Sequence, residues 1–258
     1  MLARIGLSLL AFTFSSAVLA NVVAKEYPVK DFSELVVSGE TELEVSQTGK
    51  EYLRIEADAE VMEHVKVDQS GKRVSVWAKK SGNFFSWFGN HDSMRIKVIV
   101  HVKDLEYLEL SGASNATVGD LKTKSLYLGA SGAANGNFSN LNANYLKGNL
   151  SGAANLRFDT INSLEQEFEL SGAANLDIKT TSSTAKLKAG ASGASNIRAK
   201  NLTANSAELD ASGASHIDVS VKDELDAEAS GASSINYYGN PQANTQATGA
   251  SSVNARRN

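Results

Sequence analysis

The chain has 258 residues, of which 42% are hydrophobic and 21% are charged, and its formal net charge is −4. This composition is that of a folded globular protein and excludes general disorder, and the net negative charge argues against nucleic acid as a partner. Cysteine is absent, which excludes disulfides, thiol catalysis, thiolate metal sites and a lipid anchor on an N-terminal cysteine.

Residues 1–20 predict a cleaved secretory signal peptide. Arg4 precedes an apolar run from Ile5 to Phe14, and Val18-Leu19-Ala20 forms a cleavage site of small residues. The apolar run is too short for a membrane anchor. No later stretch of the sequence is long and apolar enough to span a membrane. We therefore expect an exported protein that resides in the periplasm or at the cell surface.

Residues 21–110 predict a β-rich N-terminal region. Short runs of alternating apolar residues, such as Leu35–Val37, Leu43–Val45 and Val74–Val76, have the period of strands with one buried face. This region can either begin the helix of strands described below or form a separate sandwich-like cap. A cap is physically useful because the open end of a β-structure is a sticky edge.

Residues 80–93 interrupt this pattern with a glycine-flanked aromatic segment. It contains the candidate binding residues Phe84, Phe85, Trp87 and Phe88. Aromatic residues on a loop can contact sugars, membranes or proteins. The alternative is that these rings fold back onto the body of the protein and cover its end, because large aromatic side chains usually become buried.

Residues 111–258 consist of eight copies of a motif that begins Ser/Thr-Gly-Ala-Ser/Ala. Their spacing is close to 20 residues, and such a fixed period identifies a repeat architecture. The copies begin at Ser111, Ser131, Ser151, Ser171, Ser192, Ser212, Ser230 and Thr248.

Apolar and polar residues alternate on both sides of each motif, as in Leu156-Arg157-Phe158. Each copy thus predicts two short strands joined by a tight corner. A unit of this length cannot bury its own apolar face, so successive copies must stack. The spacing is too short for a propeller blade, and a helical period is missing. The sequence predicts an all-β protein built as a right-handed parallel β-helix.

Two repeat positions form columns along this predicted helix. Asparagine recurs in the first column, where stacked side chains can hydrogen-bond to one another along the axis; a ligand-binding row is the alternative. The second column alternates in sign, which predicts ion pairs between neighbouring coils; a solvated charged face is the alternative. The first column contains Asn115, Asn135, Asn155, Asn175 and Asn196, and the second contains Arg157, Asp177, Arg198 and Asp218.

The sequence offers no convincing catalytic, cofactor or metal site. The four histidines lack metal-ligand spacing, and the abundant serines belong to the repeat. Asp218, Asp223, Glu224 and Asp226 form an acidic cluster, and polysaccharide-cleaving β-helix enzymes use acidic groups in a groove. A solvated charged turn is the simpler interpretation. Sequence leaves the oligomeric state open.

The chain resembles a known family, the auto-transporter adhesin head domain or GIN domain. Its opening matches at Phe32, Leu35, Val37, Gly39, Leu43, Val45 and Gln47, its body matches in the repeats, and its close matches at Tyr237, Gly239 and Pro241. The resemblance covers about residues 28–255. It implies a parallel β-helix in a bacterial envelope protein and brings no established catalytic residues. We therefore expect a non-enzymatic, adhesin-like binding or scaffolding module without a cofactor, with a polysaccharide or an envelope or surface protein as its partner. The rival classes are a carbohydrate-active enzyme and a purely structural envelope component.

Overall fold

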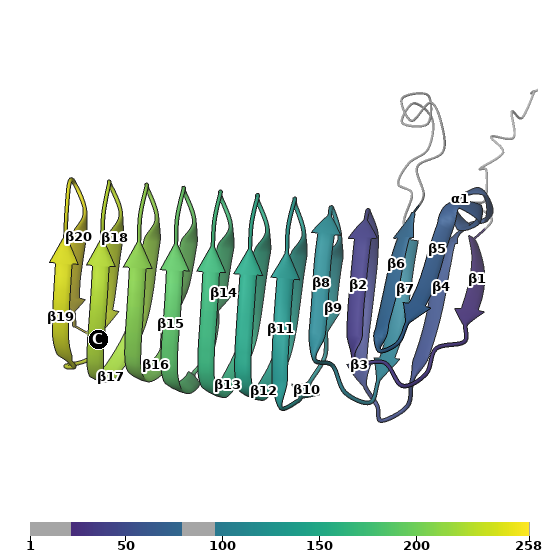
Figure 1. Ribbon diagram of the computed structural model, residues 1–258, viewed down its shortest axis with the longest axis horizontal. Coiled ribbons are helices and arrows are strands. Elements are labelled where there is room, and N and C mark those ends of the chain that lie inside the picture. The colour runs from purple at the N-terminus through teal and green to yellow at the C-terminus, as the bar shows by residue number, and fades with distance from the viewer. Residues whose placement is uncertain (1–21, 79–95, 258) are drawn as a thin grey trace, which may run out of the picture.

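The computed structural model describes residues 22–78 and 96–257, and these form a β-solenoid of about eight turns with a β-rich N-terminal end (Figure 1). This confirms the predicted parallel β-helix. The solenoid strands are β8 (Tyr107–Gly112), β9 (Asn115–Val118), β10 (Leu121–Lys122), β11 (Ser125–Ala130), β12 (Asn135–Leu150), β13 (Asn155–Leu170), β14 (Asn175–Ile178), β15 (Ser182–Ala191), β16 (Asn196–Ala211), β17 (His216–Ala229), β18 (Ser234–Tyr238), β19 (Gln242–Ala247) and β20 (Ser252–Arg256).

Neighbouring coils pair in parallel and in the register that the repeat predicts. Asn135 pairs with Asn155, and Leu150 pairs with Leu170. Because equivalent residues lie above one another, each repeat position becomes a column parallel to the axis. Each long strand bends, so one coil contains a strand that follows the corner and a strand that leads into the next corner.

The corners are tight because the glycine of every motif has a positive φ, as at Gly152 (70°) and Gly172 (76°). The following residue donates a backbone hydrogen bond to the glycine one coil earlier, for example from Ala173 N to Gly152 O at 2.7 Å. The corners therefore belong to the same backbone ladder as the strands. They leave no room for a side chain at the glycine.

The core is a continuous stack of side chains inside the solenoid. Phe138 and Phe158 stack with ring centroids 4.7 Å apart, and Phe168 packs beside Phe158 at 6.3 Å. Two strand glycines make space for these large residues. A Cβ on Gly148 would lie 2.7 Å from the ring of Phe168, and one on Gly136 would lie 2.7 Å from Leu156. At these two places a glycine on one coil faces a large side chain on the next, which gives dense packing.

The N-terminal end does not follow chain order. The strands β2 and β3 form a coil beside β8 and β9, and a second coil made of β6 and β7 lies on their other side, all in parallel (Figure 1). The elements are β1 (Val22–Tyr27), β2 (Glu34–Gly39), β3 (Thr41–Gln47), β4 (Tyr52–Asp58), α1 (Ala59–His64), β5 (Val65–Ser70), β6 (Arg73–Ala78) and β7 (Ile96–Val102).

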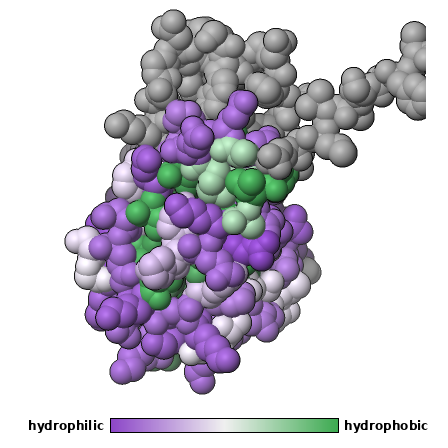
Figure 2. All heavy atoms as spheres, turned by 90° about the vertical axis from the view of Figure 1, so that its right-hand side faces the viewer, coloured by the Kyte–Doolittle hydropathy of each residue, from purple (hydrophilic) through white to green (hydrophobic). Residues whose placement is uncertain are grey.

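Antiparallel strands finish this end. The strand β4 pairs with β7 and then with β1, and β5 pairs with β6. The outer strands carry Lys25, Glu26, Lys66 and Asp68, and charged edge strands discourage pairing with other chains. Figure 2 shows this end as mostly hydrophilic, with an apolar patch beside the residues drawn in grey. The strand β8, which contains residue 110, is hydrogen-bonded to β2 of the N-terminal end. The division of the chain into two regions at residue 110 stays a prediction.

Candidate functional site

The strands that follow the corners carry an open groove of about 630 Å³ on their outer side. We call it the amide groove. The asparagine column forms one border, Gly136 and Leu156 lie between the columns, and the second column forms the other border. The polar residues that line the groove are Asn115, Asn135, Asn137, Asn155, Arg157, Asn175, Asp177 and Arg198.

The asparagine column is a hydrogen-bonded ladder, as predicted. Asn135 Nδ2 donates to Asn115 Oδ1 at 2.9 Å, and the same contact recurs up to Asn196 at 2.9–3.0 Å. Asn155 Nδ2 also donates to the carbonyl oxygen of Ala153 at 3.0 Å. These amide groups form most of their hydrogen bonds with one another, so the ladder stabilises the stack and gives the groove a rigid border.

The predicted ion pairs between coils are wrong, although the residues do lie opposite one another. Arg157 pairs in register with Asp177, and Asp177 pairs with Arg198. The carboxylate of Asp177, however, forms a close ion pair with Lys179, the first residue after its own strand. The side chain two residues along projects on the same face, and it reaches the carboxylate first.

The two arginines are therefore left without strong partners. Arg157 Nε reaches Asp159 at only 4.0 Å, with both side chains more than half exposed. Within the part of the chain that the structure describes, Arg198 forms no ion pair or side-chain hydrogen bond. Asn137 also has no hydrogen-bonded side chain there. The amide groove thus presents two guanidinium groups and a free amide to solvent.

The asparagine column ends at His216, where the polar contacts resemble a nucleophile, a base and an orienting acid. His216 Nδ1 lies 2.6 Å from Ser234 Oγ, and Nε2 lies 2.9 Å from Asp218 Oδ2. Acyl transfer also needs free N–H groups to stabilise the oxyanion. The backbone N–H of Ser234 instead donates to Ser215 O at 3.0 Å, and that of Ser252 donates to Ser233 O at 3.1 Å. The contacts therefore continue the column of polar side chains along the axis.

The strands that lead into the corners present a second surface, which we call the acidic face. Between residues 107 and 246 its outward positions hold nine carboxylates and three lysines, which is a net charge of 3 − 9 = −6. The carboxylates are Glu109, Glu165, Glu167, Glu169, Glu208, Asp210, Glu224, Asp226 and Glu228, and the lysines are Lys147, Lys186 and Lys188.

Several side chains on the acidic face form hydrogen bonds with one another. Hydrogen bonds from Lys147 at 2.7 Å and Tyr145 at 2.9 Å hold the pKa of Glu167 below its usual value. Burial, followed by the nearby charge of Glu167, raises the pKa of Glu169. Burial and a hydrogen bond to Glu109 raise the pKa of Tyr107 to about 12. These shifts have local structural causes.

The four predicted carboxylates are not brought together. Glu224 and Asp226 line a hollow of about 370 Å³ on the acidic face, beside β19. Asp218 lies on the other part of β17, beside β18, and Asp223 is exposed between the two parts. Within the described ranges, no group of three or more histidine, aspartate or glutamate side chains could hold a metal ion.

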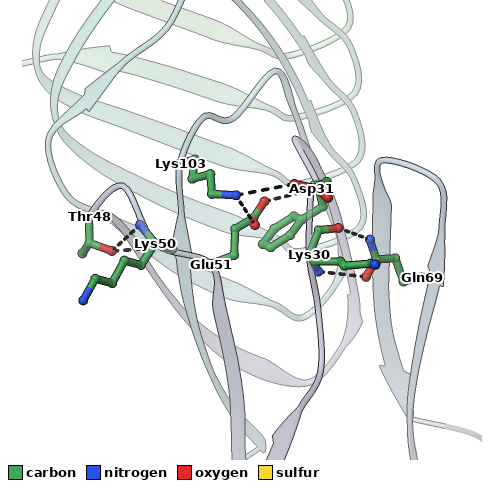
Figure 3. A network of polar contacts seen from close by, with 8 residues as sticks. Lys30, Asp31, Thr48, Lys50, Glu51, Gln69 and Lys103 are labelled. Carbon is green, nitrogen blue, oxygen red and sulfur yellow. Dashed lines mark hydrogen bonds and ion pairs between the residues drawn. The ribbon is translucent and has the colours of Figure 1, made fainter.

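An ion-paired cluster holds three strand connections of the N-terminal end together (Figure 3). Lys103 Nζ lies 2.7 Å from Glu51 and 3.5 Å from Asp31. Glu51 accepts a hydrogen bond from the backbone N–H of Phe32 at 3.0 Å. Burial alone would raise the pKa of Glu51, but the hydrogen bonds and the charge of Lys103 lower it below its ordinary value of 4.5. The carboxylate thereby ties three connections between strands together.

We expect Glu51→Gln to lower the free energy of unfolding by roughly 1–3 kcal/mol at neutral pH, because it removes charge-assisted hydrogen bonds from a side chain that is 7% exposed. The pKa of Glu51 is lower in the folded state, so this contribution is present above about pH 4.5 and disappears as the pH falls through the folded-state value. Denaturation of both proteins over this range should show their difference shrinking in acid. A constant difference would contradict the assignment.

Two sets of predicted residues lie outside the described part of the chain. These are the signal peptide, residues 1–20, and the aromatic residues Phe84, Phe85, Trp87 and Phe88. The described ends of β6 and β7 flank the aromatic segment. They pair with β2 and β3, which join through the corner at Gly39. Among the described residues, no helix is long and apolar enough to cross a membrane.

The fold and these surfaces define a β-solenoid protein with repetitive polar faces. Residues 31–241 match the family model described as "Putative auto-transporter adhesin, head GIN domain", and the chain belongs to this family. The resemblance seen in the sequence is thereby confirmed. No curated protein matches the chain.

Solved structures share this fold. One is described as a "putative lipid binding protein" from Parabacteroides distasonis, with a TM-score of 0.79 and 22% identity over 92% of this chain and 97% of that one. A "putative adhesin" from Parabacteroides merdae has a TM-score of 0.78 and 17% identity over 92% and 96%. A "putative adhesin" from P. distasonis has a TM-score of 0.74 and 20% identity over 91% and 97%. At these identities the likeness concerns the fold.

Proposed function

We propose that the protein is a non-enzymatic, exported binding module of the bacterial cell envelope. The observation that carries this proposal is the amide groove, a long polar surface held rigid by a backbone ladder and a side-chain ladder. Such a surface suits an extended polymer, because equivalent groups recur along the axis. Membership of an adhesin family supports the same role.

The partners in this proposal are an envelope polysaccharide or a surface protein, and the location is the periplasm or the cell surface. The sequence of residues 1–20 supports export. The aromatic residues Phe84, Phe85, Trp87 and Phe88 stay a proposed contact site, and the strands on either side of their segment, β6 and β7, belong to the N-terminal end. The name of one structural neighbour makes a lipid a further candidate ligand.

Two tests address the proposal. Cell fractionation of the full chain, with N-terminal sequencing, should find an exported protein that begins at Asn21. The exported chain should then bind members of a panel of envelope polysaccharides, and Phe84→Ala with Trp87→Ala should weaken that binding. Trp77→Ala is the control, because it removes an aromatic side chain that is 38% exposed on β6. A stable protein that binds nothing in the panel or in whole envelopes would favour a structural role.

The enzyme alternative receives less support. Its acidic residues lie on separate parts of β17, Asp218 beside β18 and Glu224 and Asp226 beside β19, and the backbone N–H groups of Ser234 and Ser252 are already bonded to carbonyl oxygens. Incubation of the same polysaccharides with the chain should leave their lengths unchanged. Shortened products that disappear in a Glu224→Gln variant would reverse this conclusion.

A further inference from the structure

Unneutralised positive charge in the amide groove identifies a ligand class. Arg157 and Arg198 line the groove beside the asparagine ladder, and Asp177, which pairs in register with both, is already bound to Lys179. Arg157 reaches Asp159 at only 4.0 Å, and Asp218, in register with Arg198, lies 2.9 Å from His216 Nε2. An arginine without a carboxylate partner can form two parallel hydrogen bonds with an incoming one. The free amide of Asn137 can bind hydroxyl groups.

The distribution of charge over the solenoid favours binding of an anion at the amide groove. The acidic face has a net charge of −6, whereas the outward positions of the strands that follow the corners hold five cations and three carboxylates between residues 115 and 256, a net of 5 − 3 = +2. The cations are Lys122, Arg157, Arg198, Lys200 and Arg256, and the carboxylates are Asp159, Asp177 and Asp218. Repulsion from one face and attraction to the other orient an anionic partner.

The spacing of the two arginines fits a polymer. They are separated by two coils, because Asp177 pairs in register with both, and two steps of a β-ladder correspond to about 10 Å. The groove runs along the axis, is open, and is mostly polar. An apolar anchor of the kind that dominates protein interfaces has no deep pocket to enter here.

We propose that the amide groove binds an acidic polysaccharide, one whose sugars carry carboxylate groups, along the solenoid axis. The inference rests on the proposed binding function and names its ligand class. Arg157 and Arg198 bind carboxylates on separate sugars, and Asn137, which lies one coil before Arg157, contacts hydroxyl groups of the sugar beyond it. The asparagine ladder keeps these groups at fixed intervals, so little ordering is needed on binding.

Polygalacturonate is the probe, and fully methyl-esterified polygalacturonate is the matched neutral polymer. We expect the wild-type chain to bind the acid form, more weakly at high salt, and to bind the ester far less. Arg157→Gln and Arg198→Gln should each weaken binding about fivefold, the effect of one exposed ion pair. Their combination should weaken it about 25-fold if the effects add. Biolayer interferometry with immobilised polymer measures these affinities.

The control variant is Lys186→Gln with Lys222→Gln. It changes the net charge by the same amount, at one lysine on the acidic face and one exposed at the bend of β17. Binding within about twofold of wild type is expected, because distant exposed charges are screened. Equal weakening by both double variants would overturn the groove as the site. So would equal binding of inorganic polyphosphate, since it would show a general anion surface.

Asp177→Asn supplies a prediction of opposite sign. It removes the carboxylate from the groove and frees Lys179, so polygalacturonate should bind more tightly, by about twofold to fivefold. Unchanged or weaker binding, in a variant with the melting temperature of the parent, would contradict the proposal. If the parent binds other envelope polymers but not polygalacturonate, this inference fails while the proposed function stands. If it binds none, both fail.

Discussion

Replacing Gly172 with alanine is expected to lower the free energy of unfolding by roughly 2–5 kcal/mol, the sum of a left-handed backbone and an overpacked contact. The φ of Gly172 is 76°. A Cβ at this position would lie 2.7 Å from Gly152 O and 3.1 Å from Gly152 N. The same oxygen accepts the hydrogen bond from Ala173 N at 2.7 Å. The methyl group must therefore separate two coils where their backbones pair.

Gly49→Ala separates the two causes of this loss. Gly49 has nearly the same φ, 74°, but an added Cβ would meet nothing within 4 Å. Its loss should be about 1–2 kcal/mol, the cost of the backbone conformation alone. Guanidinium denaturation followed by circular dichroism measures both variants. Equal losses would show that the corners tolerate a methyl group and that conformation alone selects glycine in the repeat.

Most of the fold could be predicted from the repeat in the sequence. A motif that recurs about every 20 residues predicts which residues stack, because equivalent positions must lie on neighbouring coils. Asn135 opposite Asn155 is such a pair. The alternation around each motif predicts the buried face, and Leu156 and Phe158 are indeed inside. The stacking register and the buried face are therefore predictable from short sequence patterns, because every coil repeats the same pattern.

The order of coils at the N-terminal end could not be predicted in the same way. Alternation shows that β2, β3, β6 and β7 are strands, but it does not say which strand lies next to which. One signal was present, since Ser38 and Gly39 repeat the first two residues of the motif and pair with Ser111 and Gly112. The later pairing of β6 with β2 has no comparable mark in the sequence.

The candidate groove was predicted only in part. Its two columns are visible in the sequence, where they predict contacts that stabilise the stack, with a ligand-binding row as the alternative for the asparagines and a solvated face for the charges. The choice between a partner on the next coil and one on the same coil depends on side-chain conformation. Lys179 lies two residues after Asp177 and reaches it first, so Arg198 is left for a ligand. Alternating lysine and aspartate at this spacing is the signal that could have indicated this.

Gln166→Leu is expected to raise the free energy of unfolding by roughly 1–3 kcal/mol, the penalty for an unpaired buried polar group. The side chain is 2% exposed inside the solenoid. It lies between Leu146 and Leu187 on the neighbouring coils. Among the described residues, neither its Nε2 nor its Oε1 has a hydrogen-bond partner. Leucine at the same position extends a column of leucines and has a similar size.

The reciprocal variant Leu187→Gln tests the cost of an unpaired buried amide one coil further along. It should lose roughly 2–5 kcal/mol, because it removes apolar contacts and buries a second unpaired amide. Both changes should shift the midpoint of guanidinium denaturation while leaving its slope unchanged, since the exposed surface on unfolding stays the same. A Gln166→Leu variant less stable than its parent would mean that the amide is hydrogen-bonded to ordered water inside the coil. A gain would show that this coil tolerates a polar residue at the expense of stability, because stacking on both sides holds it in place.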